Sequence, residues 1–168
     1  MSNPYFNQVI TGFSQSLQNL SALLDKAAAH AAANKFDLAN VLAARLYPDM
    51  LGCARQIQIA TDFAKGAAAR LTGTEPPKWD DTEVSAEELQ ARIRKALDFL
   101  ATFKAEQFAA TDTRAIEIKT PVGAFNFTGE SFLTHWAVPN FYFHYTTAYN
   151  LLRHSGVPIG KFDFLGGL

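Results

Sequence analysis

The stretch SAEELQARIRKALDFLATF, at residues 85–103, carries the clearest signal for the fold. It begins with Ser85 and places Glu88 three residues later, which is the pattern of a capping box at a helix N-terminus. Apolar residues then recur at steps of three and four, as on the buried face of an amphipathic helix. They are Leu89, Ile93, Ala96, Leu97, Leu100 and Phe103. This stretch therefore predicts a helix that packs against a core.

The N-terminal stretch has the same periodicity. Asn3 is placed to cap a helix with Pro4 at its first position, where a missing amide hydrogen costs nothing. The apolar stripe that follows predicts a helix that continues to about Ala33. Its members are Phe6, Val9, Phe13, Leu17, Leu20, Leu24 and Ala27.

Two further helices are expected before residue 85. Asp37 gives a start signal for a short helix that the pair Tyr47-Pro48 bends or ends. A new helix is then expected to run from Pro48 to a terminating Gly73. Its apolar positions are Met50, Cys53, Ile57, Ala60, Ala64 and Leu71. Residues 74–82 contain adjacent prolines and predict an ordered loop.

The C-terminal part changes character at residues 115–128. Apolar and polar residues alternate there on both sides of a turn at 121–123, which predicts a short antiparallel hairpin. Residues 129–154 then predict a helix with one interruption at Pro139. The tail from Ile159 onward is expected to pack back as irregular chain.

These elements predict an all-α fold, a four-helix bundle with a small β-hairpin inserted before the last helix. The chain has 168 residues, of which 48% are hydrophobic, and this fits one domain over residues 1–168. Fifteen Lys and Arg residues against sixteen Asp and Glu residues leave no surplus positive charge for a nucleic-acid partner.

Composition also predicts the compartment. The N-terminus lacks the pattern of a signal peptide, and no apolar run approaches the ~20 residues that a membrane-spanning helix needs. Cys53 is the only cysteine, which excludes an intramolecular disulfide and a cysteine-built zinc site. We therefore expect a cytoplasmic protein without a membrane partner.

The last helix holds the best candidates for a functional site. At ~100° per residue, Asn140 and His144 lie about 40° apart, so both polar side chains could meet one ligand. His135 falls on the opposite face if the helix is continuous, and the two histidines should then not share a metal.

The helix expected from Pro48 adds the polar residues Asp49, Gln56 and Asp62. Arg55 and Asp62 could instead belong to a solvated face. His144 could likewise be a histidine that is hydrogen-bonded within an aromatic-rich core. The sequence contains no phosphate-binding loop, dinucleotide fingerprint or His-Glu-x-x-His motif.

Four segments carry a resemblance to a known family: LYPDM (46–50), AKGAAARL (64–71), PNFYFH (139–144) and LRHSGVP (152–158). They resemble a bacterial domain-of-unknown-function branch of the DinB/YfiT-like superfamily, and the resemblance covers nearly the full length. That superfamily is a four-helix bundle, frequently dimeric, whose better-known members bind a divalent metal through three histidines. Some members act as thiol-dependent transferases or isomerases.

The resemblance also implies a set of site residues. His144 matches the second of two paired histidines on the last helix, Asn140 stands at the first position, and the third position falls near Gln56. One imidazole and two amides would hold a borderline divalent cation weakly, because amide oxygens are neutral donors that prefer harder ions. The resemblance therefore implies the pocket more than a tightly bound metal.

Three hypotheses follow. In the first, the protein binds a small molecule in the bundle cleft through His144, Asn140, Gln56 and Asp49. In the second, it is a metal-dependent transferase or hydrolase-like enzyme, in which His144 and Asp49 hold nickel, zinc or manganese to activate a thiol or water. In the third, it is a homodimeric interaction protein whose aromatic-rich last helix forms the interface. The sequence leaves open whether it is an enzyme.

Overall fold

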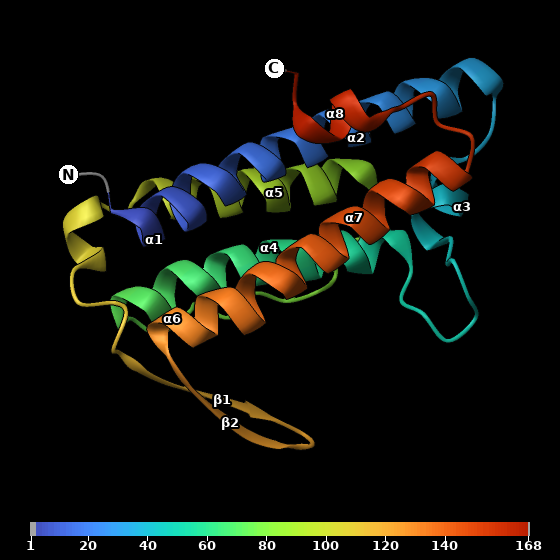
Figure 1. The fold of residues 1–168 in the computed structure, drawn as a ribbon. Helices are drawn as coiled ribbons and strands as arrows, with labels where there is room; N and C mark the ends of the chain where they lie inside the picture. The colour runs from blue at the N-terminus through green and yellow to red at the C-terminus, as the bar shows by residue number, and fades with distance from the viewer. Residues whose placement is uncertain (1–2, 168) are drawn as a thin grey trace.

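The computed structural model describes residues 3–167, and four long helices form its bundle (Figure 1). Helices α2 and α5 lie side by side, as do α4 and α7, and α4 also packs on α5. The elements up to the hairpin are α1 (Pro4–Phe6), the π-helical η1 (Asn7–Gly12), α2 (Phe13–Asn34), α3 (Leu38–Ala43), α4 (Cys53–Thr72), α5 (Ala86–Ala101) and the 3-10 turn η2 (Ala105–Phe108). The predicted fold class is confirmed.

The capping signals in the sequence act as expected. The side chain of Asn3 accepts hydrogen bonds from the backbone amides of Tyr5 and Phe6, at 3.0 and 3.2 Å. At the start of α5, the Ser85 hydroxyl accepts from the Glu88 amide while the Glu88 carboxylate accepts from the Ser85 amide, so the capping box is complete. Local chemistry therefore sets these two helix starts.

The start of α4 differs from the prediction. The helix begins at Cys53 rather than at Pro48, because the residues around Pro48 form a turn that Arg45 holds: its guanidinium donates to the carbonyls of Pro48 and Met50. Gly52 is extended, with φ −70° and ψ 167°, and it packs so closely on α3 that a Cβ there would lie 3.0 Å from the Ala43 carbonyl oxygen. Long-range contact therefore decides this boundary.

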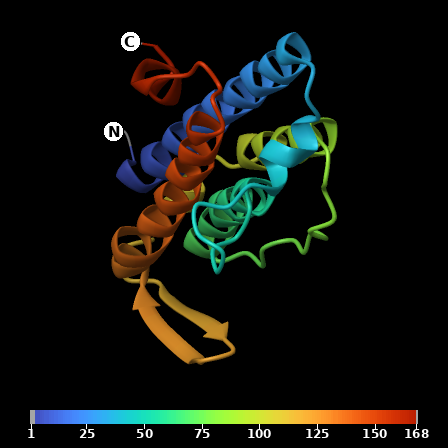
Figure 2. The same cartoon turned by 90° about the vertical axis from the view of Figure 1, so that its right-hand side faces the viewer.

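The hairpin and the last helix follow the predicted order. Strands β1 (Ala115–Thr120) and β2 (Gly123–Thr128) pair antiparallel and project from one end of the bundle (Figure 2). The chain then continues as one helical rod through α6 (Gly129–Phe132), the π-helical η3 (Leu133–Ala137) and α7 (Val138–His154). The interruption expected at Pro139 takes the form of the wide π turn directly before it, since proline donates no helix hydrogen bond.

The C-terminal tail is not irregular, as the sequence suggested, but forms helix α8 (Lys161–Leu165) on the outside of α2. The carbonyl of Phe164 accepts hydrogen bonds from Asn19 and from the Tyr145 hydroxyl. The Phe164 ring also stacks on Tyr145, with centroids 4.2 Å apart. These tertiary contacts stabilise a helix too short to form alone.

The core is built around α4. Small side chains at Ala60, Ala64 and Ala68 are fully buried, which lets α4 approach its neighbours closely. On the opposite side of the core, Phe13 of α2 stacks on Phe141 of α7 with centroids 4.1 Å apart. Within the described residues, no helix combines the length and apolar character needed to cross a membrane.

Candidate functional site

His144 and Gln56 form a direct pair across the interface of α7 and α4. The Nδ1 atom of His144 lies 2.7 Å from the side-chain oxygen of Gln56. The Gln56 amide nitrogen in turn donates to the Leu51 carbonyl at 3.0 Å. Gln56 is 2% exposed, so both ends of its buried amide have a partner. The sequence placed these two side chains near one another, and the structure joins them.

This chain of hydrogen bonds fixes the protonation of the ring. Since the Gln56 nitrogen donates to Leu51, its oxygen faces His144 and must accept, which makes Nδ1 of His144 the protonated nitrogen. Burial, together with the positive charge of Arg55, lowers the pKa of His144 from 6.5 to about 4. At neutral pH the imidazole is therefore uncharged and its Nε2 carries a lone pair.

Aromatic rings frame this imidazole. Phe63 of α4 stacks on His144, with centroids 5.8 Å apart and planes 14° from parallel. Phe143 meets it edge-on at 5.2 Å and is itself exposed. His144 remains half-buried, so its environment is apolar but not sealed from solvent. Sequence reasoning missed Phe63, although it lies seven residues, or two turns, after Gln56 on the same helix face.

The two other predicted residues stand apart from this pair. Asn140 lies one turn before His144, and its amide nitrogen donates to the Trp136 carbonyl at 2.7 Å. Asp49 lies in the exposed turn that precedes α4, because the helix begins four residues later than Asp49. No hydrogen bond or ion pair joins Asp49 to another described residue.

These donors do not fit the three-histidine metal site that the family resemblance implies for other members. His144 offers one imidazole nitrogen, whereas the Gln56 amide is occupied at both ends. Between residues 3 and 167, no three His, Cys, Asp or Glu side chains come together as a possible metal site. The nearby charge of Arg55 also opposes a cation. The arrangement is instead that of a hydrogen-bond acceptor in a half-apolar setting.

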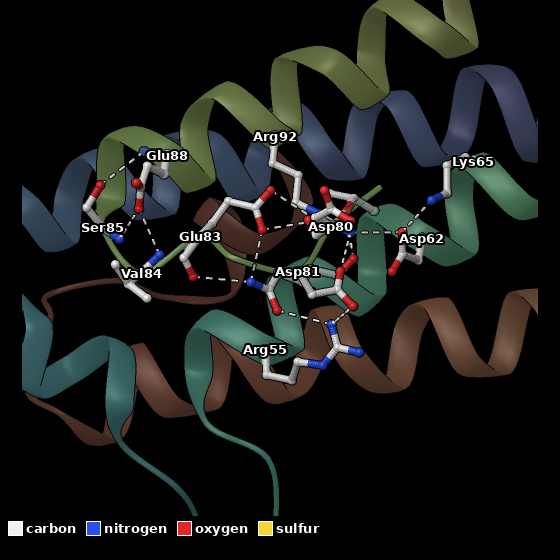
Figure 3. Close-up of polar contacts among 12 residues, drawn as sticks. Arg55, Asp62, Lys65, Asp80, Asp81, Glu83, Val84, Ser85, Glu88 and Arg92 are labelled. Carbon is white, nitrogen blue, oxygen red and sulfur yellow. Dashed lines mark hydrogen bonds and ion pairs between the residues drawn. The ribbon is translucent and has the colours of Figure 1, made fainter. Parts of the chain in front are cut away.

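A second polar cluster surrounds Arg92 of α5 (Figure 3). This side chain is 1% exposed, and its Nε donates to the Thr61 hydroxyl at 2.8 Å. Its Nη1 contacts the Glu83 carboxylate at 3.0 Å. Its Nη2 lies 2.9 Å from carboxylate oxygens of both Asp62 and Asp81. Every part of the buried guanidinium therefore has a partner.

The cluster ties the segment 73–85 across α4 and α5. Lys65 pairs with Asp62 at 2.7 Å, and Arg55 pairs with Asp81 at 2.6 Å. Arg55 and Asp62 thus belong to a connected ionic network rather than to a simple solvated face (Figure 3). The sequence contained a signal for the burial of Arg92, because Arg92 lies three residues after Leu89 on the apolar face of its helix.

Comparisons with known proteins agree with this architecture. The family model described as domain of unknown function (DUF1993) matches residues 5–165. The crystal structure of a DinB family member protein from Shewanella denitrificans superposes with a TM-score of 0.90 at 43% sequence identity, covering 97% of this chain and 92% of that chain. No curated protein matches this chain. The sequence match and the shared fold together show that this chain belongs to the DUF1993 family of DinB-like proteins.

Proposed function

We propose that this protein binds a small organic molecule beside His144, and that the Nε2 atom of the ring accepts a hydrogen bond from the ligand. The observation that carries the proposal is the fixed tautomer: the Gln56 oxygen accepts a hydrogen bond from Nδ1 of His144, 2.7 Å away, and the lowered pKa keeps the ring neutral. A lone pair held in one direction in a partly apolar setting is suited to ligand recognition, because the ring loses little conformational entropy when a ligand binds.

The surroundings define the class of ligand. Phe63 and Phe143 favour an apolar or aromatic body, and the charge of Arg55 disfavours a cation. Asn140 adds a side-chain oxygen one turn away, to which no described residue donates. The ligand is therefore a neutral or anionic molecule with an apolar body and a hydroxyl or amide hydrogen. Gln56 positions the ring and does not contact the ligand itself.

Phenol and benzyl alcohol are suitable probes, because each carries one hydroxyl on an aromatic ring. With 15N-labelled histidine, we expect either probe to shift the Nε2 resonance of His144 with saturable dose dependence. In ligand-observed saturation-transfer spectra, His144→Leu should abolish the signal, while the matched change His154→Leu at an exposed position of the same helix should preserve it. An Nε2 resonance that neither probe moves would contradict the proposal.

A homodimer is a second proposal, and a specific feature favours it. Two large apolar residues beside the His144–Gln56 pair face solvent: Phe143 is 56% exposed and Leu51 is 43% exposed. Leu51 is tied to this place because its carbonyl accepts from Gln56. Pairing with a second copy would remove this apolar surface from water and would partly enclose the imidazole.

A further inference from the structure

A cleft of about 1340 Å³ opens between the C-terminal half of α4, the segment 73–80 and strand β1. Neither His144 nor Gln56 lines it, and Phe63 is the residue that touches both places. Trp79 and Trp136 also line the cleft, and they are the two tryptophans of the chain. The cleft is thus a separate region with its own fluorescent reporters.

Two arginines occupy one wall of this cleft. Arg70 comes from α4, and Arg114 comes from the chain just before β1. The Nη1 atom of Arg70 lies directly over Gly66, and that of Arg114 lies over Gly73, so that a Cβ at either glycine would collide with a guanidinium. Gly66 lies within α4 and Gly73 is its left-handed C-cap, so the two glycines are about two helical turns, on the order of 10 Å, apart. The two guanidinium groups therefore lie over different turns of the chain.

Neither guanidinium has a hydrogen bond or ion pair with any other residue that the structure describes. The Nε of Arg114 is the one fully buried side-chain polar atom between residues 3 and 167 without a partner. Burial lowers the pKa of Arg70, yet an arginine side chain stays protonated in proteins. Both side chains are partly buried, and a fully buried donor such as the Nε of Arg114 is costly unless an acceptor meets it.

Other charges in the cleft do not supply that acceptor. Lys65 pairs with Asp62 at 2.7 Å, and Lys119 pairs with Glu117 at 3.5 Å. The charge of Glu75 favours the protonated form of Arg70, but the two side chains form no ion pair. The remaining lining charges, Lys78 and Asp80, have opposite signs.

We propose that this cleft binds a small molecule carrying two separated oxyanion groups, one held by Arg70 and the other by Arg114. Guanidinium groups present paired N–H donors that match carboxylate and phosphate oxygens. The spacing of the two arginines selects a molecule with two anionic ends over a molecule with one. Trp136 and the Ile116 and Ile118 side chains of β1 belong to the same lining and receive the hydrocarbon part that joins the two ends. The partial negative charge at the C-terminus of α4 helps to hold Arg114 in place before the ligand arrives.

Titration of tryptophan fluorescence tests this directly, with adipate as the two-ended probe and hexanoate as the one-ended probe of equal carbon number. Sodium chloride keeps the ionic strength constant. We expect a saturable change with adipate and affinity at least about tenfold weaker with hexanoate, since one charge-assisted contact is lost. Inorganic phosphate should compete with adipate only weakly. Equal affinity for adipate and hexanoate, or no saturable change with adipate, would overturn the proposal.

Variants localise the effect. Arg70→Gln and Arg114→Gln should each weaken adipate binding about tenfold, whereas Arg153→Gln, the same change at an exposed position of α7, should leave it unaltered. Gly66→Ala changes no charge but displaces the Arg70 guanidinium, and it should weaken adipate binding in the same way. Equal losses in all three arginine variants would indicate bulk charge and refute the site. If an arginine variant fails to fold, the Gly66→Ala variant decides, and unchanged adipate affinity in that variant refutes the proposed site.

Discussion

At the level of single residues, the chemistry of His144 depends on one buried amide. The Gln56 oxygen accepts a hydrogen bond from the Nδ1–H of His144, and the Gln56 amide nitrogen donates to the Leu51 carbonyl, so the ring has a defined tautomer without any carboxylate. A carboxylate in the place of Gln56 would favour the imidazolium form. An amide instead leaves the ring neutral and its Nε2 free to accept.

The lowered pKa of His144 makes folding stability depend on pH. The unfolded chain takes up this proton near pH 6.5 and the folded chain only near pH 4, so the unfolded state binds more protons between these values. The contribution of neutral His144 to the free energy of unfolding is fully present above about pH 6.5 and is lost as the pH falls toward 4. Because the ring is half-buried and partly screened by solvent, we expect a loss of about 1–2 kcal/mol from this group. Urea unfolding at pH 7 and pH 4.5 measures it.

Two variants isolate this contribution. His144→Leu should remove this part of the pH dependence, whereas His154→Leu should retain it. Gln56→Glu should raise the pKa of His144, as followed by NMR titration of the ring, because a carboxylate then contacts Nδ1. An identical pH profile in wild type and His144→Leu would contradict the assignment.

The family resemblance predicted that His144 and Gln56 lie near one site, whereas helical spacing alone placed only Asn140 beside His144. The environment of Asp49 was not predictable in this way. Its exposed place depends on Arg45, which folds the preceding turn back on itself, and no local pattern in the sequence encodes that contact. The orientation of the ring depends likewise on the Leu51 carbonyl, a backbone atom that a sequence motif does not report.

At the level of elements, the segment between α4 and α5 is held by ionic contacts rather than by regular structure. Arg92→Met keeps most of the side-chain volume but leaves the Glu83, Asp62 and Asp81 carboxylates without their shared cation. Removing one partner of a buried ion pair costs about 3–5 kcal/mol, and we expect the lower part of that range here because the carboxylates keep some solvent. The free energy of unfolding in urea measures the loss.

Arg94→Met is the matched control, since Arg94 is exposed two residues away on the same helix. That change should alter stability by less than about 0.5 kcal/mol. Hydrogen exchange should also accelerate within residues 73–85 in Arg92→Met and not in Arg94→Met. A loss in Arg92→Met no larger than in the control would show that the network does not stabilise the fold.

Helix starts were predictable wherever a side chain caps them, as at Asn3, Asp37 and Ser85. Boundaries set by distant contacts were not. Gly52 starts α4 without a side-chain cap, and α8 adds the packing of Phe164 on Tyr145 to the contact between the Asp163 carboxylate and the Gly160 amide. The alternating pattern predicted that the two strands of the hairpin pair. It did not predict that β1 would form a wall of the cleft that holds Arg70 and Arg114, here called the arginine cleft.

At the level of the whole molecule, the bundle joins two distinct polar regions through one aromatic side chain. Phe63 stacks on His144 on one side and lines the arginine cleft on the other. The apolar stripes predicted that four helices pack together, since each needs a partner for its buried face. They carried no information on the cleft, because residues 114–119 and Trp136 are distant in sequence from residues 62–80 and meet them only in the folded chain.

The proposed homodimer belongs to this scale. If the apolar side chains near His144 form a symmetric interface, Phe143→Ser should shift the protein from dimer to monomer, because it places a hydroxyl at the centre of a surface that pairing would dry. Sedimentation velocity over a range of protein concentrations measures the change. Val122→Ser is the control: Val122 is 87% exposed in the turn between β1 and β2, which belongs to neither α4 nor α7. A wild-type protein that stays monomeric at high concentration, or equal effects of the two serine variants, would exclude this face as the interface.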